Sequence, residues 1–210
     1  MPELERLITD ALNRNVSRET LDCLSTHLEL LRKWNTTINL VSPSTLAAGA
    51  VRHIADSAQL MNCTTGYEHS WLDFGSGGGF PGLVCAIIAK ELAPELSFTL
   101  VESDKRKSAF LVNAARTVNV NVTVFSKRIE DLPPQGADII SARAVASLSK
   151  LLEYAHPHLS GAGKCIFPKG ERFKQELGAA RQQWNFKLSQ KPSITDDNAA
   201  ILVLGDIARV

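Results

Sequence analysis

The chain reads Asp73-Phe74-Gly75-Ser76-Gly77-Gly78-Gly79-Phe80-Pro81-Gly82 between an apolar stretch at 71–74 and a longer apolar stretch at 81–89. A strand, a glycine-rich turn and a helix in this order are typical of α/β sites for nucleotide-like ligands. Glycine has no Cβ, so the backbone can turn sharply and approach a ligand closely. The start of the helix behind the turn favours an anionic group. We therefore expect this loop to bind a nucleoside-like cofactor.

Three kinds of ligand use such a loop. A P-loop site needs a Lys-Ser/Thr pair after the glycines, which the chain lacks. Residues 77–82 match the dinucleotide pattern G-x-G-x-x-G, which leaves a nicotinamide-dependent oxidoreductase open. Counted from Gly75, directly after the strand, the pattern is Asp-x-Gly-x-Gly-x-Gly with Phe80 in place of the third dinucleotide glycine. That register favours S-adenosylmethionine.

A second acidic residue supports a nucleoside ligand. Glu102 ends the next apolar stretch, 98–102, where a carboxylate can bind both hydroxyls of a ribose. Nicotinamide cofactors are held in the same way, so Glu102 does not choose between the two cofactors. A glycine-rich turn without any ligand is the less favoured alternative, because strand, loop, helix and acid all coincide.

The periodicity of apolar residues predicts a helical segment followed by a doubly wound core. Helices are expected at 4–12, from Ser17 to Trp34, and from near Ser44 to Met61. Beyond residue 70, short apolar runs alternate with helical stretches, which predicts a Rossmann-like α/β fold with a mostly parallel, twisted sheet. The division is a helical cap at 1–66 packed on a core at 67–210, as one structural unit. The expected core strands are 71–74, 97–101, 122–125, 137–141, 164–167 and 201–204, with a weaker one at 186–188, and the expected core helices are 81–89, 105–119, 147–158 and 171–184.

Composition places few limits on the partner. The 210 residues are 44% hydrophobic and 21% charged, with a net charge of +1, so an RNA partner is neither required nor excluded. The four cysteines are scattered and show no zinc-ligand spacing. No secretory signal or membrane-spanning run is evident. We expect a cytoplasmic protein with reduced thiols, no metal and no membrane partner, and a monomer.

Motifs along most of the chain carry a family resemblance. They are Lys33-Trp34-Asn35, Asn39-Leu40, Arg52-His53-Ile54-x-Asp56-Ser57, the loop 73–82, Glu102-Ser103-x-Lys105-Arg106-Lys107, Arg128-Ile129-Glu130 and Ser141-Ala142-Arg143-Ala144. Together they resemble the glucose-inhibited division protein B family, which methylates guanine at N7 in small-subunit ribosomal RNA. The resemblance implies a class I methyltransferase fold, S-adenosylmethionine as cofactor, and 16S ribosomal RNA or the small ribosomal subunit as partner.

The cofactor-binding candidates come from the loop, the second strand and the resemblance; they are Gly75, Gly77, Phe80, Glu102, Ile129, Glu130 and Arg143. The resemblance places Ile129 and Glu130 near the adenine. Glu130 is equally well explained as an exposed acid at a helix start, and Phe80 as ordinary core. Arg143 is expected just beyond the fourth strand, where side chains point at the ligand crevice. For Arg52, His53 and Asp56 we favour a structural role, with Arg52 and Asp56 as an i,i+4 ion pair.

The expected chemistry requires no catalytic side chain. N7 of guanine has a free lone pair, so the enzyme mainly has to align it with the methyl group. A carboxylate or carbonyl near the base would help electrostatically, but no sequence feature identifies it. The exocyclic-amine motif Asp/Asn-Pro-Pro-aromatic and the cysteine of pyrimidine methyltransferases are both missing after the fourth strand. A non-enzymatic alternative is an RNA-binding ribosome assembly factor with this fold.

Basic residues suggest where RNA would lie. They cluster at 105–107, 127–128, Arg143 and 164–174. Several follow the carboxyl ends of expected strands, on the cofactor side. We interpret them as a positive rim for RNA phosphates, with a solvated, charge-balanced surface as the alternative.

Overall fold

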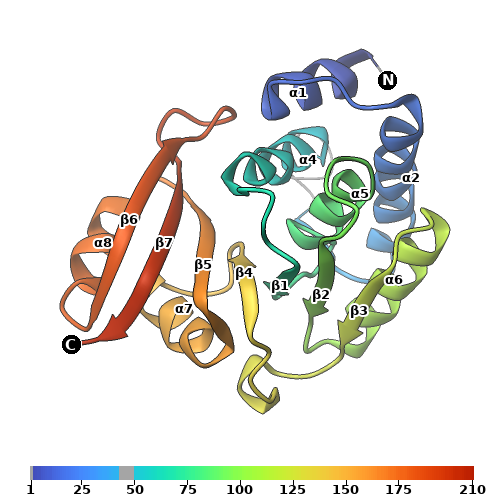
Figure 1. The fold of residues 1–210 in the computed structure, drawn as a ribbon. Helices are drawn as coiled ribbons and strands as arrows, with labels where there is room; N and C mark the ends of the chain where they lie inside the picture. The colour runs from blue at the N-terminus through green and yellow to red at the C-terminus, as the bar shows by residue number, and fades with distance from the viewer. Residues whose placement is uncertain (1, 43–49) are drawn as a thin grey trace.

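The computed structural model describes residues 2–42 and 50–210 and contains one seven-stranded sheet (Figure 1). The strand order is β3-β2-β1-β4-β5-β7-β6. The first five strands pair in parallel, whereas β7 runs antiparallel to both β5 and β6. The order reverses between β1 and β4, which is where open α/β sheets bind ligands. The strands are β1 (Ser70–Phe74), β2 (Ser97–Val101), β3 (Val122–Phe125), β4 (Ala137–Ala142), β5 (Leu159–Lys169), β6 (Trp184–Pro192) and β7 (Ala200–Arg209).

Helices cover both faces of the sheet, as Figure 1 shows. Alternate strand residues enter two separate apolar layers, because successive side chains of a strand point to opposite faces. Trp71 of β1 belongs to the layer with α1, α2, α4, α5 and α6, whereas Leu72 and Phe74 belong to the layer with α7 and α8. The helices are α1 (Pro2–Leu12), α2 (Arg18–Asn35), α4 (Ala50–Ala58), α5 (Gly82–Leu92), α6 (Lys105–Thr117), α7 (Leu148–Ala155) and α8 (Phe173–Ala180), with 3-10 turns η1 (Gln59–Cys63), η2 (Ile129–Asp131) and η3 (His156–His158).

Of the N-terminal helices, α2 and α4 pack on α5, and α1 packs on α4. Their apolar stripes are buried in the same layer as the residues of α5. The hydroxyl of Ser17 caps α2 by accepting from the Thr20 amide at 3.2 Å. The Ser17 amide also donates to Glu91 at the end of α5, at 3.0 Å to each carboxylate oxygen. The helical segment is thus fixed to the core by apolar and polar contacts.

All seven expected strands are present, and the predicted α/β fold is confirmed. The strands buried on both faces match the prediction to within one residue. The three C-terminal strands are longer than expected. After Trp184, β6 carries half-buried and exposed residues at the edge of the sheet, and β5 includes the exposed residues 161–162 near its start. The expected helix at 171–184 is shorter, at Phe173–Ala180. The expected start of the third helix, at 44–49, lies outside the described residues.

None of the helices in the described ranges is long and apolar enough to cross a membrane. The same residues contain no group of three or more His, Cys, Asp or Glu side chains that could hold a metal ion.

Candidate functional site

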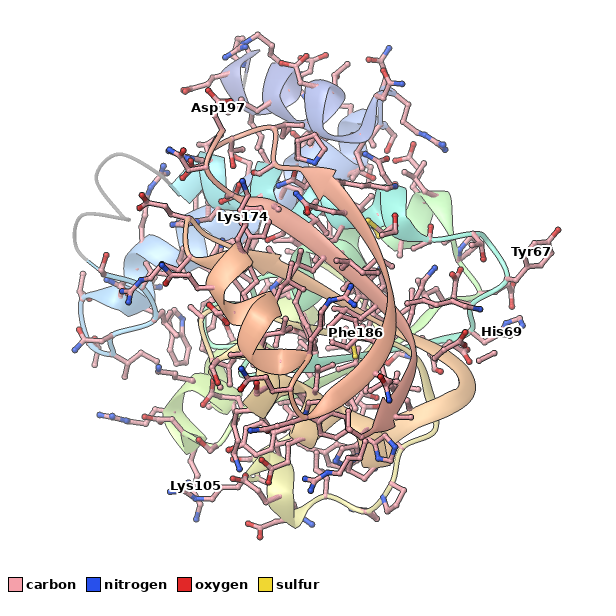
Figure 2. The ribbon with its side chains drawn as sticks, turned by 90° about the vertical axis from the view of Figure 1, so that its left-hand side faces the viewer. Tyr67, His69, Lys105, Lys174, Phe186 and Asp197 are labelled. Atoms are coloured by element: carbon pink, nitrogen blue, oxygen red, sulfur yellow. The ribbon has the colours of Figure 1, made fainter. Side chains whose placement is uncertain are left out.

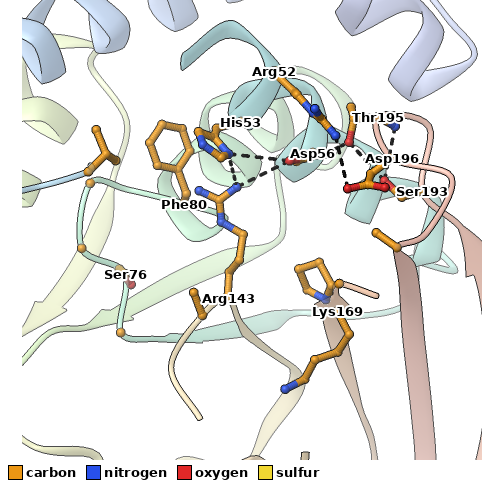
Figure 3. Close-up of a pocket in the computed structure, with 18 of the residues that line it drawn as sticks. Arg52, His53, Asp56, Ser76, Phe80, Arg143, Lys169, Ser193, Thr195 and Asp196 are labelled. Atoms are coloured by element: carbon orange, nitrogen blue, oxygen red, sulfur yellow. Dashed lines mark hydrogen bonds and ion pairs between the residues drawn. The ribbon is translucent and has the colours of Figure 1, made fainter. Parts of the chain in front are cut away.

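A cavity of about 510 Å³ opens at the carboxyl ends of the central strands (Figure 3). Its floor is the glycine loop, with Glu102 on one side and Arg143 on the other. The remaining walls come from residues 40–42, from α4, from residues 168–170 at the end of β5, and from the segment 193–201, which connects β6 to β7 and includes the first two residues of β7. The cavity therefore lies at the topological switch point between β1 and β4.

The glycine loop has a backbone that other residues rarely adopt. Gly75 and Gly77 have φ angles of +63° and +50°, which lie in the left-handed region. A Cβ on Gly75 would also lie 2.6 Å from Cγ2 of Val145. The loop is closed on itself, because the Ser76 amide donates to the Val101 carbonyl at 3.1 Å and the Phe80 amide to the Ser76 carbonyl at 3.1 Å. The glycine loop is therefore held in a fixed conformation before a ligand binds.

The side chain of Asp73 stabilises the glycine loop from inside the protein. The carboxylate is fully buried and accepts hydrogen bonds from the hydroxyls of Ser141 at 2.5 Å and Ser76 at 2.6 Å, and from the Gly82 amide at 3.2 Å. Burial raises the pKa of Asp73 to about 6, against the lowering effect of these donors. The first amide of α5, that of Gly82, is therefore used inside the protein and is not offered to an anionic ligand, contrary to the expectation from sequence.

Glu102 lies where the sequence placed it, at the end of β2 beside the loop. Its side chain is mostly buried, with the residue 8% exposed. One carboxylate oxygen accepts from the Gly77 amide at 3.0 Å and the other from the Asp104 amide at 2.9 Å. A carboxylate oxygen can accept more than one hydrogen bond, so both oxygens keep capacity for two neighbouring hydroxyl groups.

A second cavity, of about 180 Å³, adjoins the first. Gly75 and Glu102 line both cavities, and Ile129 and Glu130 line the smaller one. The Tyr154 hydroxyl donates to Glu130 at 2.9 Å. The pKa of Glu130 is lowered by the backbone amide of Glu130 itself and by Tyr154. Glu130 is exposed at the start of η2, so it is both a helix-start acid and a cavity residue.

Arg143 reaches into the larger cavity from the end of β4 and contacts the helical segment. Its Nη1 lies 2.8 Å from Nδ1 of His53, and its guanidinium carbon lies 5.0 Å from the centre of the Phe80 ring (Figure 3). A guanidinium can only donate, so Nδ1 of His53 is the acceptor in this contact. Burial lowers the pKa of Arg143, and the charges of Asp56 and Asp73 oppose that shift. Phe80 is buried and also lines the cavity, so both of its expected roles coexist.

The predicted ion pair between Arg52 and Asp56 is wrong. Arg52 instead lies 3.5 Å from Asp196 in the segment between β6 and β7. Asp56 accepts from the hydroxyl of Thr195 and faces His53 and Arg143. Arg52, His53 and Asp56 all line the larger cavity. These residues of α4 therefore belong to the site and not to the outer surface of the helix.

Comparison with known proteins gives the family. The family model GidB, described as rRNA small subunit methyltransferase G, matches residues 20–200. The chain belongs to this family. Curated relatives named ribosomal RNA small subunit methyltransferase G are 51% identical in Cereibacter sphaeroides, over 100% of both chains, and 48% identical in Ruegeria pomeroyi, over 97% of this chain and 100% of the relative. Another, from Paramagnetospirillum magneticum, is 44% identical over 98% and 96% of the two chains.

Solved structures that share this fold include methyltransferases. The O-methyltransferase from Bacillus cereus in complex with SAH has a TM-score of 0.63 at 15% identity, over 96% of both chains. A SAM-dependent methyltransferase from Aquifex aeolicus has a TM-score of 0.57 at 13% identity, over 85% of this chain and 97% of the other. These likenesses confirm the class I methyltransferase fold. Membership of the GidB family confirms methyltransferase activity and S-adenosylmethionine, and leaves no support for the oxidoreductase alternative.

The residues present fit this cofactor. The two cavities meet at Gly75 and Glu102, so one ligand can extend through both. Gly75 lines both cavities, and a Cβ there would collide with Val145. Glu102 keeps hydrogen-bonding capacity that suits the hydroxyls of a ribose, and Arg143 supplies a cation that suits a carboxylate.

The basic rim predicted from sequence needs a correction. Lys164 lies within β5 and donates to Glu68 at 2.6 Å and to the Cys63 carbonyl at 2.7 Å. Lys169 is nearly buried and donates to Glu176 at 2.8 Å and to the Ala146 carbonyl at 2.9 Å. Both ammonium groups are therefore used in internal contacts. Arg52, Lys127 and Arg128 are exposed and line the two cavities. The other exposed residues of the predicted basic clusters are Lys105, Arg106, Arg172 and Lys174.

His27 is a residue of this site that the sequence did not reveal. It lies on α2, fully buried beneath the loop, with its ring 5.4 Å from that of Phe80. A Cβ on Gly79 would lie 2.9 Å from Cε1 of His27. Burial lowers the pKa of His27 to about 4, so the ring is neutral at pH 7. In the sequence it is one more residue on the buried stripe of a helix.

Proposed function

We propose that this methyltransferase transfers a methyl group from S-adenosylmethionine to N7 of one guanine in 16S ribosomal RNA. The observation that carries the proposal is the pair of cavities joined at Gly75 and Glu102, with a separate wall for an acceptor, in a chain of the GidB family. The smaller cavity suits the adenine, and the larger one suits the methionine end and the acceptor base. The non-enzymatic alternative, an assembly factor with a vestigial site, finds no support in this intact geometry.

The cofactor would be held by the residues expected from sequence. In the proposal, Gly75 and Gly77 allow close approach, Glu102 binds the ribose, and Ile129 and Glu130 border the adenine. Arg143 and Phe80 lie at the methionine end; the guanidinium would pair with a carboxylate, which it can do in bidentate fashion. Because His53 already accepts from Arg143, the direction of that side chain is fixed before the ligand arrives.

The protein's contribution to the reaction is alignment. The bound cofactor supplies a methyl group activated by its sulfonium charge, so N7 of guanine can attack without a general base. The loop and Arg143 would fix one reactant, and the wall opposite would fix the base, which lowers the barrier by holding reactants at near-attack distance.

RNA would approach over the rim of exposed basic residues. Figure 2 shows Lys105 and Lys174 on one side of the molecule and Tyr67 and His69 on the opposite side. Tyr67 and His69 precede β1, at the amino ends of the strands, so the exposed lysines lie on the cofactor side. We propose small ribosomal subunits as substrate, and a cytoplasmic monomer as the acting form.

The decisive experiment is transfer of tritiated methyl groups to small ribosomal subunits isolated from cells that lack this enzyme, followed by nucleoside analysis. Label in 7-methylguanosine is expected, and Gly75→Asp should abolish it because the new side chain would occupy the cofactor junction. Label in another nucleoside would overturn the N7 assignment. No label in RNA, with S-adenosylmethionine still bound, would move the acceptor away from ribosomal RNA.

The rim is tested by binding at several salt concentrations. Replacing Lys105, Arg106, Lys127 and Arg128 together by Ala should weaken binding to the subunit and flatten its dependence on salt, because each lost phosphate contact lowers the slope by about one. Lys187→Ala is the matched control, since Lys187 is exposed on β6 and pairs with Asp206. An unchanged slope in the fourfold variant would show that the rim does not contact RNA.

A further inference from the structure

The larger cavity has a wall that the proposed cofactor residues do not use. It is formed by α4, by residues 168–170 and by the segment 193–201. Figure 3 shows Asp56 of α4 between Arg143 on one side and Thr195 on the other. Asp56 thus stands at the boundary between the cofactor part of the cavity and the rest of it.

Among the described residues, three carboxylates line the larger cavity, and they differ in how much hydrogen-bonding capacity remains for a ligand. Glu102 is bound to two backbone amides beside the ribose position. Asp196 accepts from the Asn198 amide at 3.0 Å, lies 3.5 Å from Arg52, and has a side chain 48% exposed. The side chain of Asp56 is 21% exposed. Of the three carboxylates, Asp56 is therefore the one that is both shielded from solvent and part of the wall formed by α4, residues 168–170 and the segment 193–201, which we call the acceptor wall.

The two oxygens of Asp56 are used unequally. Oδ1 accepts from the Thr195 hydroxyl, which fixes the carboxylate. Oδ2 lies 3.6 Å from Nδ1 of His53 and 3.8 Å from Nη1 of Arg143, both beyond the usual hydrogen-bond distance. The lone pair of His53 Nδ1 is already engaged by Arg143. Oδ2 is therefore held beside a positive charge while keeping capacity to accept from a ligand.

We propose that Asp56 reads the methyl-accepting guanine, with Oδ2 accepting from N1–H and the 2-amino group. This inference rests on the proposed function. N1 and the 2-amino group lie on the Watson–Crick edge, whereas N7 lies on the opposite side of the base, so this contact leaves N7 free to attack. Adenine presents an acceptor at N1, which the carboxylate would repel. The target guanine must then be unpaired when it binds, as is usual for bases recognised in structured RNA.

The contact also strengthens during the reaction. When N7 bonds to carbon, the carbon–sulfur bond breaks and its electron pair stays on sulfur, so the positive charge moves to the base. No proton leaves. N1–H of the cationic base is a stronger donor than before, and a fixed carboxylate stabilises the developing charge more than the neutral guanine. The loss of Asp56 should therefore lower kcat more than it raises KM.

The test compares Asp56→Asn with the wild-type protein and with Asp22→Asn. Asp22 is an exposed acid on α2 paired with Arg18, so its variant controls for the loss of one charge. Initial rates of methyl transfer are measured on small ribosomal subunits that lack the modification, and affinity for S-adenosylhomocysteine is measured by calorimetry. We expect Asp56→Asn to lose about 10²-fold in kcat, with S-adenosylhomocysteine affinity within threefold of wild type, and Asp22→Asn to behave as wild type.

A second substrate tests the contact with the 2-amino group. Once labelling has mapped the methylated nucleotide, 16S ribosomal RNA with inosine at that position is assembled into subunits. Inosine lacks the 2-amino group, so wild type should prefer guanine over inosine by about tenfold, and Asp56→Asn should lose most of that preference. Equal guanine-to-inosine ratios in the two proteins would overturn the proposal.

A purely structural role for Asp56 predicts different results. Thr195→Val removes the tie to Oδ1 but leaves the carboxylate in place, so a structural role requires it to reproduce the whole loss in kcat. That outcome, or wild-type kcat in Asp56→Asn, would overturn the proposal. If wild-type protein itself puts no label into 7-methylguanosine, the proposed function fails, which is distinct from failure of the Asp56 contact alone.

Discussion

Replacing Gly82 by Ala should destabilise this protein although the residue lies in a helix. Gly82 is the first residue of α5 and has no positive φ, so its backbone accepts any residue. A Cβ there, however, would lie 2.5 Å from Cδ2 of Leu100, and 2.6 Å from both Cβ and Oδ2 of Asp73. The Asp73 carboxylate cannot yield easily, because Ser76, Ser141 and the Gly82 amide hold it.

The size of the effect follows from these contacts. Forcing an extra carbon into a packed interior costs about 1–3 kcal/mol. Gly178→Ala is the matched control, because Gly178 lies in α8 with no atom within 4 Å of the added Cβ and no positive φ. At that position Ala should stabilise the helix by about 0.5–1 kcal/mol. The two variants should therefore differ in Tm by roughly 3–16 °C, at about 2–4 °C per kcal/mol for a chain of this length.

Thermal unfolding followed by circular dichroism measures the difference, and calorimetry with S-adenosylhomocysteine measures its consequence at the site. Gly82→Ala should also bind S-adenosylhomocysteine more weakly, because Asp73 supports the loop through Ser76. Gly178→Ala should bind it as wild type does. If Gly82→Ala were as stable as Gly178→Ala, the close approach of α5 to β1 and β2 would not be what requires glycine there.

Three further predictions concern other parts of the chain. The pKa of Glu68 is lowered to about 2; burial opposes the shift, and Lys164 and the Thr65 amide cause it. A depressed carboxyl pKa stabilises the fold above the unfolded value of about 4.3, and that stability is lost as the pH falls towards 2. Lys164→Met should therefore lower the free energy of unfolding at pH 7 and reduce its loss between pH 5 and 2.5, measured by urea titration. Phe80→Leu removes the ring beneath Arg143 and should weaken binding of S-adenosylhomocysteine about tenfold, measured by calorimetry. Leu24→Ala in α2, at a fully buried position, should lower the free energy of unfolding by about 2–5 kcal/mol and shift the unfolding of segments 1–66 and 67–210 together in a hydrogen-exchange experiment, as expected for one structural unit.

The fold could be predicted closely where burial is two-sided. β1, β2 and β4 are short apolar runs bounded by turns, because helices cover both of their faces. β6 and the start of β5 were harder to predict. Their exposed positions carry residues such as Lys187, Gly161 and Ala162, which have no strong strand preference. β6 is held by its pairing with β7, and in β5 residues 160–163 lie at a register shift between the Leu159 and Lys164 pairs with β4.

The site divides in the same way. The glycine loop, Glu102 and Arg143 could be predicted because their positions follow from the ends of neighbouring parallel strands. The partners of Arg52 and Asp56 could not, because sequence spacing suggests only local pairs. Thr195, the actual partner of Asp56, lies 139 positions away. The prediction that Lys164 is a free cation of the rim was wrong for the same reason. Its partner Glu68 lies 96 positions away, so sequence spacing could not reveal the ion pair.

These long-range contacts show how the acceptor wall is built. The strands common to class I methyltransferases provide the loop, Glu102 and the end of β4, which serve the cofactor. The wall opposite comes from α4, before the first strand, and from the segment 193–201 between the last two strands. Asp56 and Thr195 join these two segments across the cavity. Because function resides in sites added to a shared fold, selectivity for the acceptor base should depend on these two segments, and affinity for the cofactor on the strands between them.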